Sequence, residues 1–150
     1  MEANWRFHHI AVIVKDMDKA VDYYRALGVF TFPPEYMLDS STYQGYEVYG
    51  KKSEGLDKTR MQFVQMGDFR LELVSPVEGE PIYKDFLRDQ GEGIHHIAFM
   101  VDDLRAETAR FAEKGVPVLT YVKRHTGAAG YDGRLREHPA QLTDRLHEPG

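Results

Sequence analysis

Two pairs of adjacent histidines stand in two similar stretches of this sequence. Residues 7–14 read Phe-His-His-Ile-Ala-Val-Ile-Val, and residues 94–101 read Ile-His-His-Ile-Ala-Phe-Met-Val. A neutral imidazole offers a nitrogen lone pair to a divalent metal ion. An internal repeat that carries His8-His9 and His95-His96 therefore indicates that one duplication built both the fold and a site.

Glu72 is a further candidate ligand of a divalent metal ion, beside one histidine of each pair. It lies in an apolar segment and faces the side opposite Leu71 and Leu73. Two imidazoles and one carboxylate on strands of a single concave sheet would suit a divalent metal ion. The alternative is that the histidines are packed or exposed strand residues and that Glu72 lies on a solvated face. Strand alternation places His8 and His95 on the faces opposite their neighbours.

The first half reads strand, helix and three strands. Residues 7–14 form a buried strand, and the following helix is capped by Asp16 or Asp18 and stops at Gly28. Residues 45–51 form a strand, and residues 59–66 and 69–75 form a hairpin around Gly67-Asp68. Residues 29–43, broken by two prolines, are expected to be irregular, as either a functional lid or a packed surface insertion.

The second half repeats this order only in part. We expect a short linking helix before residues 91–93, a strand over 94–101, a helix over 104–114 and a strand over 116–122. Residues 134–150 are polar and lack the alternation of a core strand. The predicted organisation is one structural domain made of a first βαβββ module (1–76), a linker (77–93) and a second, incomplete module (94–150).

Composition limits the class of protein. A net charge of −5 argues against nucleic acid or an anionic membrane as the main partner, and the absence of cysteine excludes disulfides and thiolate metal sites. No stretch approaches the roughly 18 apolar residues of a membrane span, and no signal peptide is recognisable. We therefore expect a cytoplasmic protein.

Several segments resemble the vicinal-oxygen-chelate superfamily, which includes glyoxalase I, methylmalonyl-CoA epimerase, extradiol dioxygenases and bleomycin-resistance proteins. The similarity covers about residues 7–122 and is strongest to the branch of methylmalonyl-CoA epimerase and glyoxalase I. It is carried by these pieces: His8-His9-Ile10-Ala11-Val12, Ala26-Leu27-Gly28, Leu71-Glu72-Leu73-Val74-Ser75-Pro76, Gly93-Ile94-His95-His96-Ile97-Ala98-Phe99, Val101-Asp102-Asp103 and Lys114-Gly115-Val116.

The resemblance implies an α+β fold in which two βαβββ modules form a curved mixed sheet around a metal cavity. It favours the second histidine of each pair and implies His9, Glu72 and His96 as ligands of a divalent ion (Co, Zn, Mn, Ni or Fe). His8 and His95 are the runners-up, and His125 and His138 lack partner spacing. The family's chemistry is chelation of adjacent substrate oxygens, which polarises a carbonyl. A homodimer is also implied.

The sequence departs from the family in three places, one of which is residues 29–43, which look inserted relative to compact epimerases. The fourth ligand, a Glu on the last strand of the second module, has no clear match in residues 134–150, where Glu137 and Glu148 lack apolar neighbours. Met61 stands at the position that matches the epimerases' general base. Glu47 and Glu54 are nearby but out of register, and Glu47 is our candidate for the base.

Three functions follow as hypotheses. The first is a metal-dependent epimerase, isomerase or glyoxalase-like lyase acting on a small acid, thioester or α-oxo substrate; an Fe(II) dioxygenase uses a similar ligand set. The second is a metal-free binding protein whose cavity is walled by aromatic side chains, with Trp5, Tyr36, Tyr43, Tyr46 and Tyr49 as candidates. The third is a family member with an incomplete second sheet, whose open edge would favour association.

Overall fold

The computed structural model describes residues 5–39, 43–48, 51–52, 58–79, 82–118 and 120–124. The elements in chain order are β1 (Arg6–Ile13), α1 (Met17–Ala26), β2 (Tyr36–Leu38), β3 (Tyr43–Val48), β4 (Lys51–Lys52), β5 (Thr59–Met66), β6 (Phe69–Pro76), α2 (Ile82–Asp89), β7 (Gly93–Met100), α3 (Leu104–Glu113) and β8 (Thr120–Arg124). No helix in these ranges is long and apolar enough to cross a membrane.

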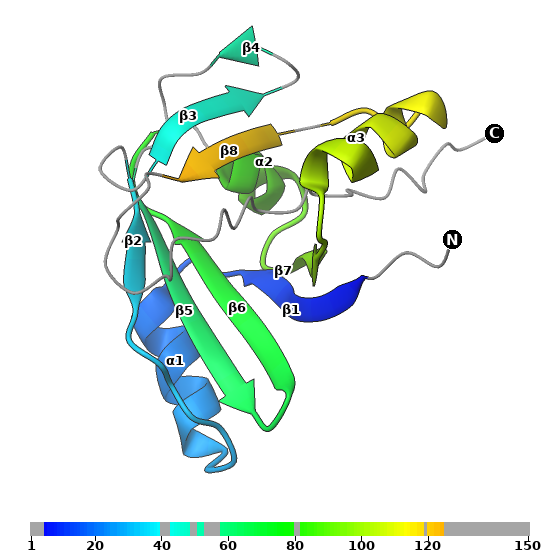
Figure 1. Ribbon diagram of the computed structural model, residues 1–150. Coiled ribbons are helices and arrows are strands. Elements are labelled where there is room, and N and C mark those ends of the chain that lie inside the picture. The colour runs from blue at the N-terminus through cyan, green and yellow to red at the C-terminus, as the bar shows by residue number, and fades with distance from the viewer. Residues whose placement is uncertain are drawn as a thin grey trace, which may run out of the picture.

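The described strands form two sheets. The larger has the order β2-β5-β6-β1-β7, and the smaller has the order β4-β3-β8 (Figure 1). Strands β1 and β6 pair in parallel, whereas the other neighbours in the larger sheet are antiparallel. The predicted α+β fold with a mixed sheet is confirmed. The division into two modules, with the last strands of the second degenerate or missing, stays a prediction, because residues 125–150 lie outside the described part of the chain.

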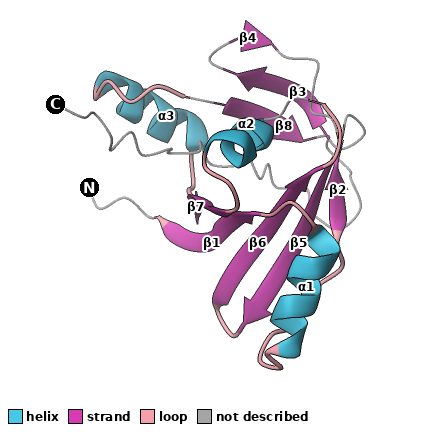
Figure 2. Ribbon diagram, turned by 180° about the vertical axis from the view of Figure 1, so that it is seen from behind, coloured by secondary structure: helices cyan, strands magenta, loops and turns pink. Residues whose placement is uncertain are grey.

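The larger sheet buries one apolar cluster on each face. Helix α1 packs against β5 and β6 on one face (Figure 2), where the core contains Val14, Met17, Val21, Val64, Leu71 and Leu73. Helix α2 packs against β1 and β6 on the other face, where the core contains Ala11, Ile13, Leu38, Met61, Val74 and Tyr83. Both faces of these central strands are therefore covered, which suits their nearly continuous apolar sequence.

Both repeats start their helices in the same way. The Asp16 carboxylate accepts a hydrogen bond from the backbone N–H of Lys19, at 3.1 Å, and Asp103 accepts one from Ala106, at 3.0 Å. Asp16, rather than Asp18, is thus the cap of α1. The two helices are followed by Gly28 and Gly115, whose φ angles of 72° and 77° favour glycine.

Two predictions about the first half were wrong. Residues 29–43 are not wholly irregular, since β2 lies within them and pairs with β5 as a strand of the larger sheet. The strand predicted over residues 45–51 is instead divided between β3 and β4, in the smaller sheet. β2 was not predicted because its three residues, which follow shortly after two prolines, are too few to show the alternation of apolar and polar residues typical of a strand.

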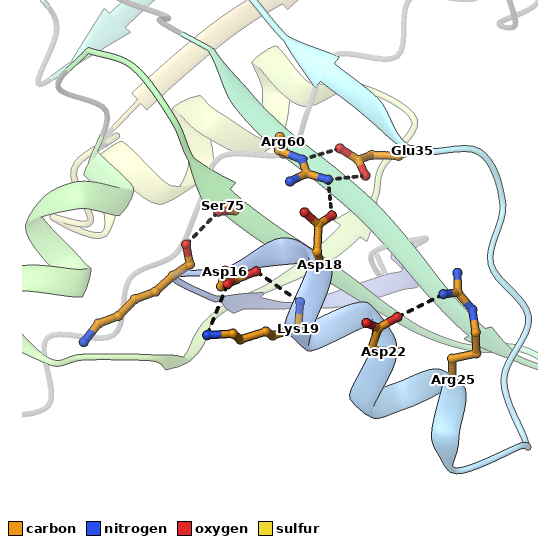
Figure 3. A network of polar contacts seen from close by, with 9 residues as sticks. Asp16, Asp18, Lys19, Asp22, Arg25, Glu35, Arg60 and Ser75 are labelled. Carbon is orange, nitrogen blue, oxygen red and sulfur yellow. Dashed lines mark hydrogen bonds and ion pairs between the residues drawn. The ribbon is translucent and has the colours of Figure 1, made fainter.

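An ion-pair cluster ties the segment before β2 to the rest of the domain. Arg60 on β5 donates hydrogen bonds to Glu35, at 2.6 and 3.0 Å, and to Asp18 on α1, at 2.7 Å (Figure 3). The hydrogen bond from Arg60 lowers the pKa of Asp18. Because Glu35 directly precedes Tyr36, this cluster fixes where β2 begins.

Candidate metal centre

Three buried side chains from three neighbouring strands meet on the face of the sheet that carries α2. His9 comes from β1, Glu72 from β6 and His96 from β7, and one ligand atom of each lies within 4.8 Å of the others. Their exposed fractions are 0%, 1% and 7%. These are the three residues predicted as metal ligands.

Strand register explains why the three side chains converge. Ala11 on β1 is paired with Glu72 on one side and with His96 on the other. His9 lies two residues before Ala11 and so shares its face of the sheet. The methyl group of Ala11, which is fully buried, therefore stands among the three side chains and leaves room between them.

The arrangement has the symmetry of the repeat. Across the antiparallel pair of β1 and β7, His9 is paired with Ala98 and His96 is paired with Ala11. The histidine of each repeat thus lies opposite the small alanine of the other, and the two rings approach to 5.5 Å between centroids. An alanine stands two residues after each second histidine in the sequence, but its part in making room for the opposite ring was not predicted.

The prediction that each first histidine faces away from its neighbour was wrong. Phe7 and His9 pair with the consecutive residues Phe99 and Ala98, so that His8 is the extra residue of a bulge. In the same way His95 is the extra residue opposite the step from Ala11 to Val12. The bulges break the alternation, which brings the Nδ1 atoms of His8 and His9 to 2.6 Å and those of His95 and His96 to 2.9 Å.

The surroundings of the Nε2 atom of His9 show whether a cation fits this site. It lies 3.0 Å from Oε2 of Glu72, but the ring does not direct this nitrogen along a hydrogen bond to the oxygen. Among the described residues no other group satisfies it, although the side chain is fully buried. A buried polar atom without a partner is costly, and a divalent ion between two imidazoles and a carboxylate would remove that cost.

Tyr36 orients the carboxylate of Glu72, one of the three side chains of the candidate metal centre (His9, Glu72 and His96, the trio). Its hydroxyl donates a hydrogen bond of 2.5 Å to Oε1 of Glu72, while Oε2 is the oxygen on the side of His9. The ring of Tyr36 packs against Phe63, 5.9 Å between centroids, and Phe63 in turn lies 5.7 Å from the ring of His9. Tyr36 was predicted only as a wall of a metal-free cavity, because β2 was not recognised.

The flanking histidines have different surroundings. His95 packs against the rings of Tyr83 and Phe86, at 5.3 and 5.0 Å, and burial lowers its pKa to about 4. It is therefore uncharged at neutral pH. His8 is instead 3.1 Å from a guanidinium nitrogen of Arg70, whose side chain lies over the ring of Phe63.

Other candidates lie apart from the trio or outside the described residues. Glu47 is exposed on β3, in the smaller sheet, and its catalytic role stays a prediction. Trp5 packs against Phe99 and Phe111. Met61, predicted from the family resemblance to stand at the position of the epimerases' base, is buried beside β2. The side chains that fall outside the described part are those of Tyr43, Tyr46, Tyr49, Glu54, His125, Glu137, His138 and Glu148.

The family model described as the Glyoxalase/Bleomycin resistance protein/Dioxygenase superfamily matches residues 8–133. The chain belongs to this superfamily. An ethylmalonyl-CoA/methylmalonyl-CoA epimerase of Cereibacter sphaeroides is 29% identical over 83% of this chain and 82% of its own length. A 3-dehydroshikimate dehydratase of Pseudomonas putida is 32% identical over 76% of this chain, but only 16% of the dehydratase is covered.

Solved structures agree on the fold of this superfamily. A variant of Streptomyces coelicolor methylmalonyl-CoA epimerase, in complex with 2-nitronate-propionyl-CoA, matches with a TM-score of 0.56 and 24% identity, covering 80% of this chain and 86% of the epimerase. The family model confirms the predicted superfamily, and the epimerase of Cereibacter sphaeroides that matches most of this chain is an enzyme, in agreement with the prediction of an enzyme.

Proposed function

We propose that this protein is a divalent-metal-dependent epimerase of a carboxylated acyl thioester, with a 2-substituted malonyl-CoA as the best candidate for its substrate. The observation that carries the proposal is the buried convergence of His9, Glu72 and His96. The choice of reaction and substrate is supported by the epimerase that matches most of this chain.

In this proposal, His9, Glu72 and His96 hold the metal ion, which when bound would polarise the thioester carbonyl and make the neighbouring C–H more acidic. Tyr36 orients the carboxylate of Glu72 through its hydrogen bond. Phe63 and the partly buried ring of Tyr36 form an apolar wall beside the trio, which limits access of water. Glu47 stays our candidate for the base that removes the α-proton.

The test is exchange of the α-proton of methylmalonyl-CoA in D2O, followed by NMR with metal-stripped protein reloaded with Co²⁺. We expect exchange by the wild type and none above the blank for His96→Ala. Glu92→Gln is the control, because Glu92 is an exposed carboxylate whose contact is the backbone N–H of Lys15. Glu47→Gln should bind Co²⁺ normally and lose exchange if Glu47 is the base.

The other reactions are outcomes of the same experiment. Turnover of a glutathione hemithioacetal, without exchange of the α-proton of methylmalonyl-CoA, would favour the glyoxalase-like lyase. Oxygen uptake after loading with Fe²⁺ would favour the dioxygenase. Ligand binding unaffected by a chelator would favour the metal-free binding protein. Any of these without α-proton exchange contradicts the epimerase. The predicted homodimer and cytoplasmic location remain part of the proposal, and sedimentation equilibrium would test the dimer.

A further inference from the structure

A chain of hydrogen bonds runs from Arg70 through His8 to His9. One guanidinium nitrogen of Arg70 lies 3.1 Å from Nε2 of His8, and Nδ1 of His8 lies 2.6 Å from Nδ1 of His9. The other nitrogen of His9, Nε2, faces Glu72. The direction of every bond in this chain follows from one fact, which is that a guanidinium only donates.

The proton positions can be deduced in order. Because Arg70 donates, Nε2 of His8 accepts, and the hydrogen of this imidazole must be on Nδ1. That hydrogen occupies the short contact to His9, so Nδ1 of His9 accepts in turn. His9 must therefore carry its own hydrogen on Nε2, the buried atom without a hydrogen-bond partner among the described residues.

This arrangement is the wrong one for a metal ligand. To bind an ion between itself and Glu72, His9 needs its lone pair on Nε2 and its hydrogen on Nδ1. Nδ1 of His8 must then accept, which places the hydrogen of His8 on Nε2, pointing at the guanidinium. Two donors cannot share a contact of 3.1 Å. As long as His8 and His9 keep their contact, metal binding and the contact between Arg70 and His8 are thus mutually exclusive.

We propose that Arg70 is a positioning residue that, through His8, holds His9 in the tautomer that cannot bind metal, and that metal uptake displaces Arg70 from His8. This inference rests on the proposed function, because it takes His9 as a ligand. The protons balance: His9 gives its Nε2 proton to solvent, the Nδ1 proton of His8 passes to His9, and solvent returns one proton to Nε2 of His8.

The second repeat lacks this restraint in the described part of the chain. His95 and His96 make the same contact between Nδ1 atoms, at 2.9 Å, but His95 lies against the rings of Tyr83 and Phe86 rather than against a cation. Among the described residues, no donor of the Arg70 kind dictates which nitrogen of His95 carries the hydrogen. In this part of the chain, the restraint by a cation therefore acts on the first pair of histidines.

Arg70 has the freedom to leave. Its side chain is only partly buried, and no carboxylate of the described residues forms an ion pair with it. Besides the contact with His8, it makes a cation–π interaction with Phe63, 5.1 Å from the ring centroid. Release from His8 thus costs one charge-assisted hydrogen bond. Because metal uptake must break this bond, its free energy is subtracted from the binding free energy of the metal.

The experiment is a competition titration of the metal-stripped full chain with Co²⁺ and a chelating dye. We expect Arg70→Met to bind Co²⁺ roughly tenfold more tightly than the wild type. Arg25→Met is the matched control, since Arg25 also lies over a ring, that of Phe32 at 5.2 Å, and is exposed on α1. It should leave the Co²⁺ affinity unchanged.

A double-mutant cycle separates the proposed effect from simple removal of a positive charge. In the background His8→Phe, which keeps a ring but removes both nitrogens, Arg70→Met should no longer tighten binding. An equal gain in both backgrounds would overturn the proposal. So would nitrogen NMR of the metal-free protein showing His9 protonated on Nδ1. Failure of the wild type to bind Co²⁺ would instead refute the proposed function, and the metal-free NMR measurement would still decide the tautomers.

Discussion

At the residue scale, two alanines are as important for the candidate centre as its charged groups. Ala11 and Ala98 lie opposite His96 and His9 on paired strands, and both are buried. A larger side chain at either position would occupy the space between the imidazoles, and overpacking of this kind costs about 1–3 kcal/mol. His9, Glu72 and His96 were chosen from sequence by their chemistry and by the family resemblance, whereas the space between them is left by the small side chains of two alanines.

Tyr36 gives a prediction at the same scale. Replacing it with Phe removes the hydroxyl that fixes Oε1 of Glu72, so the carboxylate loses its orientation while the ring packing is kept. We expect Tyr36→Phe to weaken Co²⁺ binding by about 10–100-fold, measured by competition with a chelating dye. Tyr23→Phe is the control, because Tyr23 is 64% exposed on α1. Equal affinities of the two variants would exclude Tyr36 as a positioning residue.

At the scale of elements, the repeat is a strand with a bulge followed by a capped helix. The bulges at His8 and His95 account for the one failure of strand alternation, because an extra residue cannot be seen in a pattern of period two. The cap of α1 was predicted as Asp16 or Asp18, since Asp directly before an amphipathic stretch is a strong local signal. Strand β2 was not, because its place depends on pairing with β5.

The caps allow a stability prediction. Asp16→Ala and Asp103→Ala should each lower the free energy of unfolding by about 1 kcal/mol, because each leaves a helix N–H without its partner. Urea denaturation at neutral pH measures the change. Asp22→Ala is the control: it lies inside α1 and loses only an exposed ion pair with Arg25, a contact of small energy. A cap variant as stable as this control would show that its helix does not depend on the cap.

At the scale of the whole molecule, the larger sheet places both repeats at one centre. β1 and β7 are adjacent and antiparallel, so equivalent histidines approach each other across the strand pair. This convergence was predictable from the repeated motif. The separation of β3, β4 and β8 into a second sheet was not, because it depends on pairing between segments more than seventy residues apart. The division of the chain into a first module (1–76), a linker (77–93) and a second module (94–150) stays a prediction.

Metal content of the purified protein is the most direct test of the central claim, that His9, Glu72 and His96 bind a divalent ion. We expect about one ion per chain after reconstitution with Co²⁺, Zn²⁺, Mn²⁺, Ni²⁺ or Fe²⁺. His9→Ala and His96→Ala should both lose it, and Glu92→Gln should keep it, with all variants folded by circular dichroism. A wild type that binds none of these ions, or histidine variants that retain the full amount, would contradict the account.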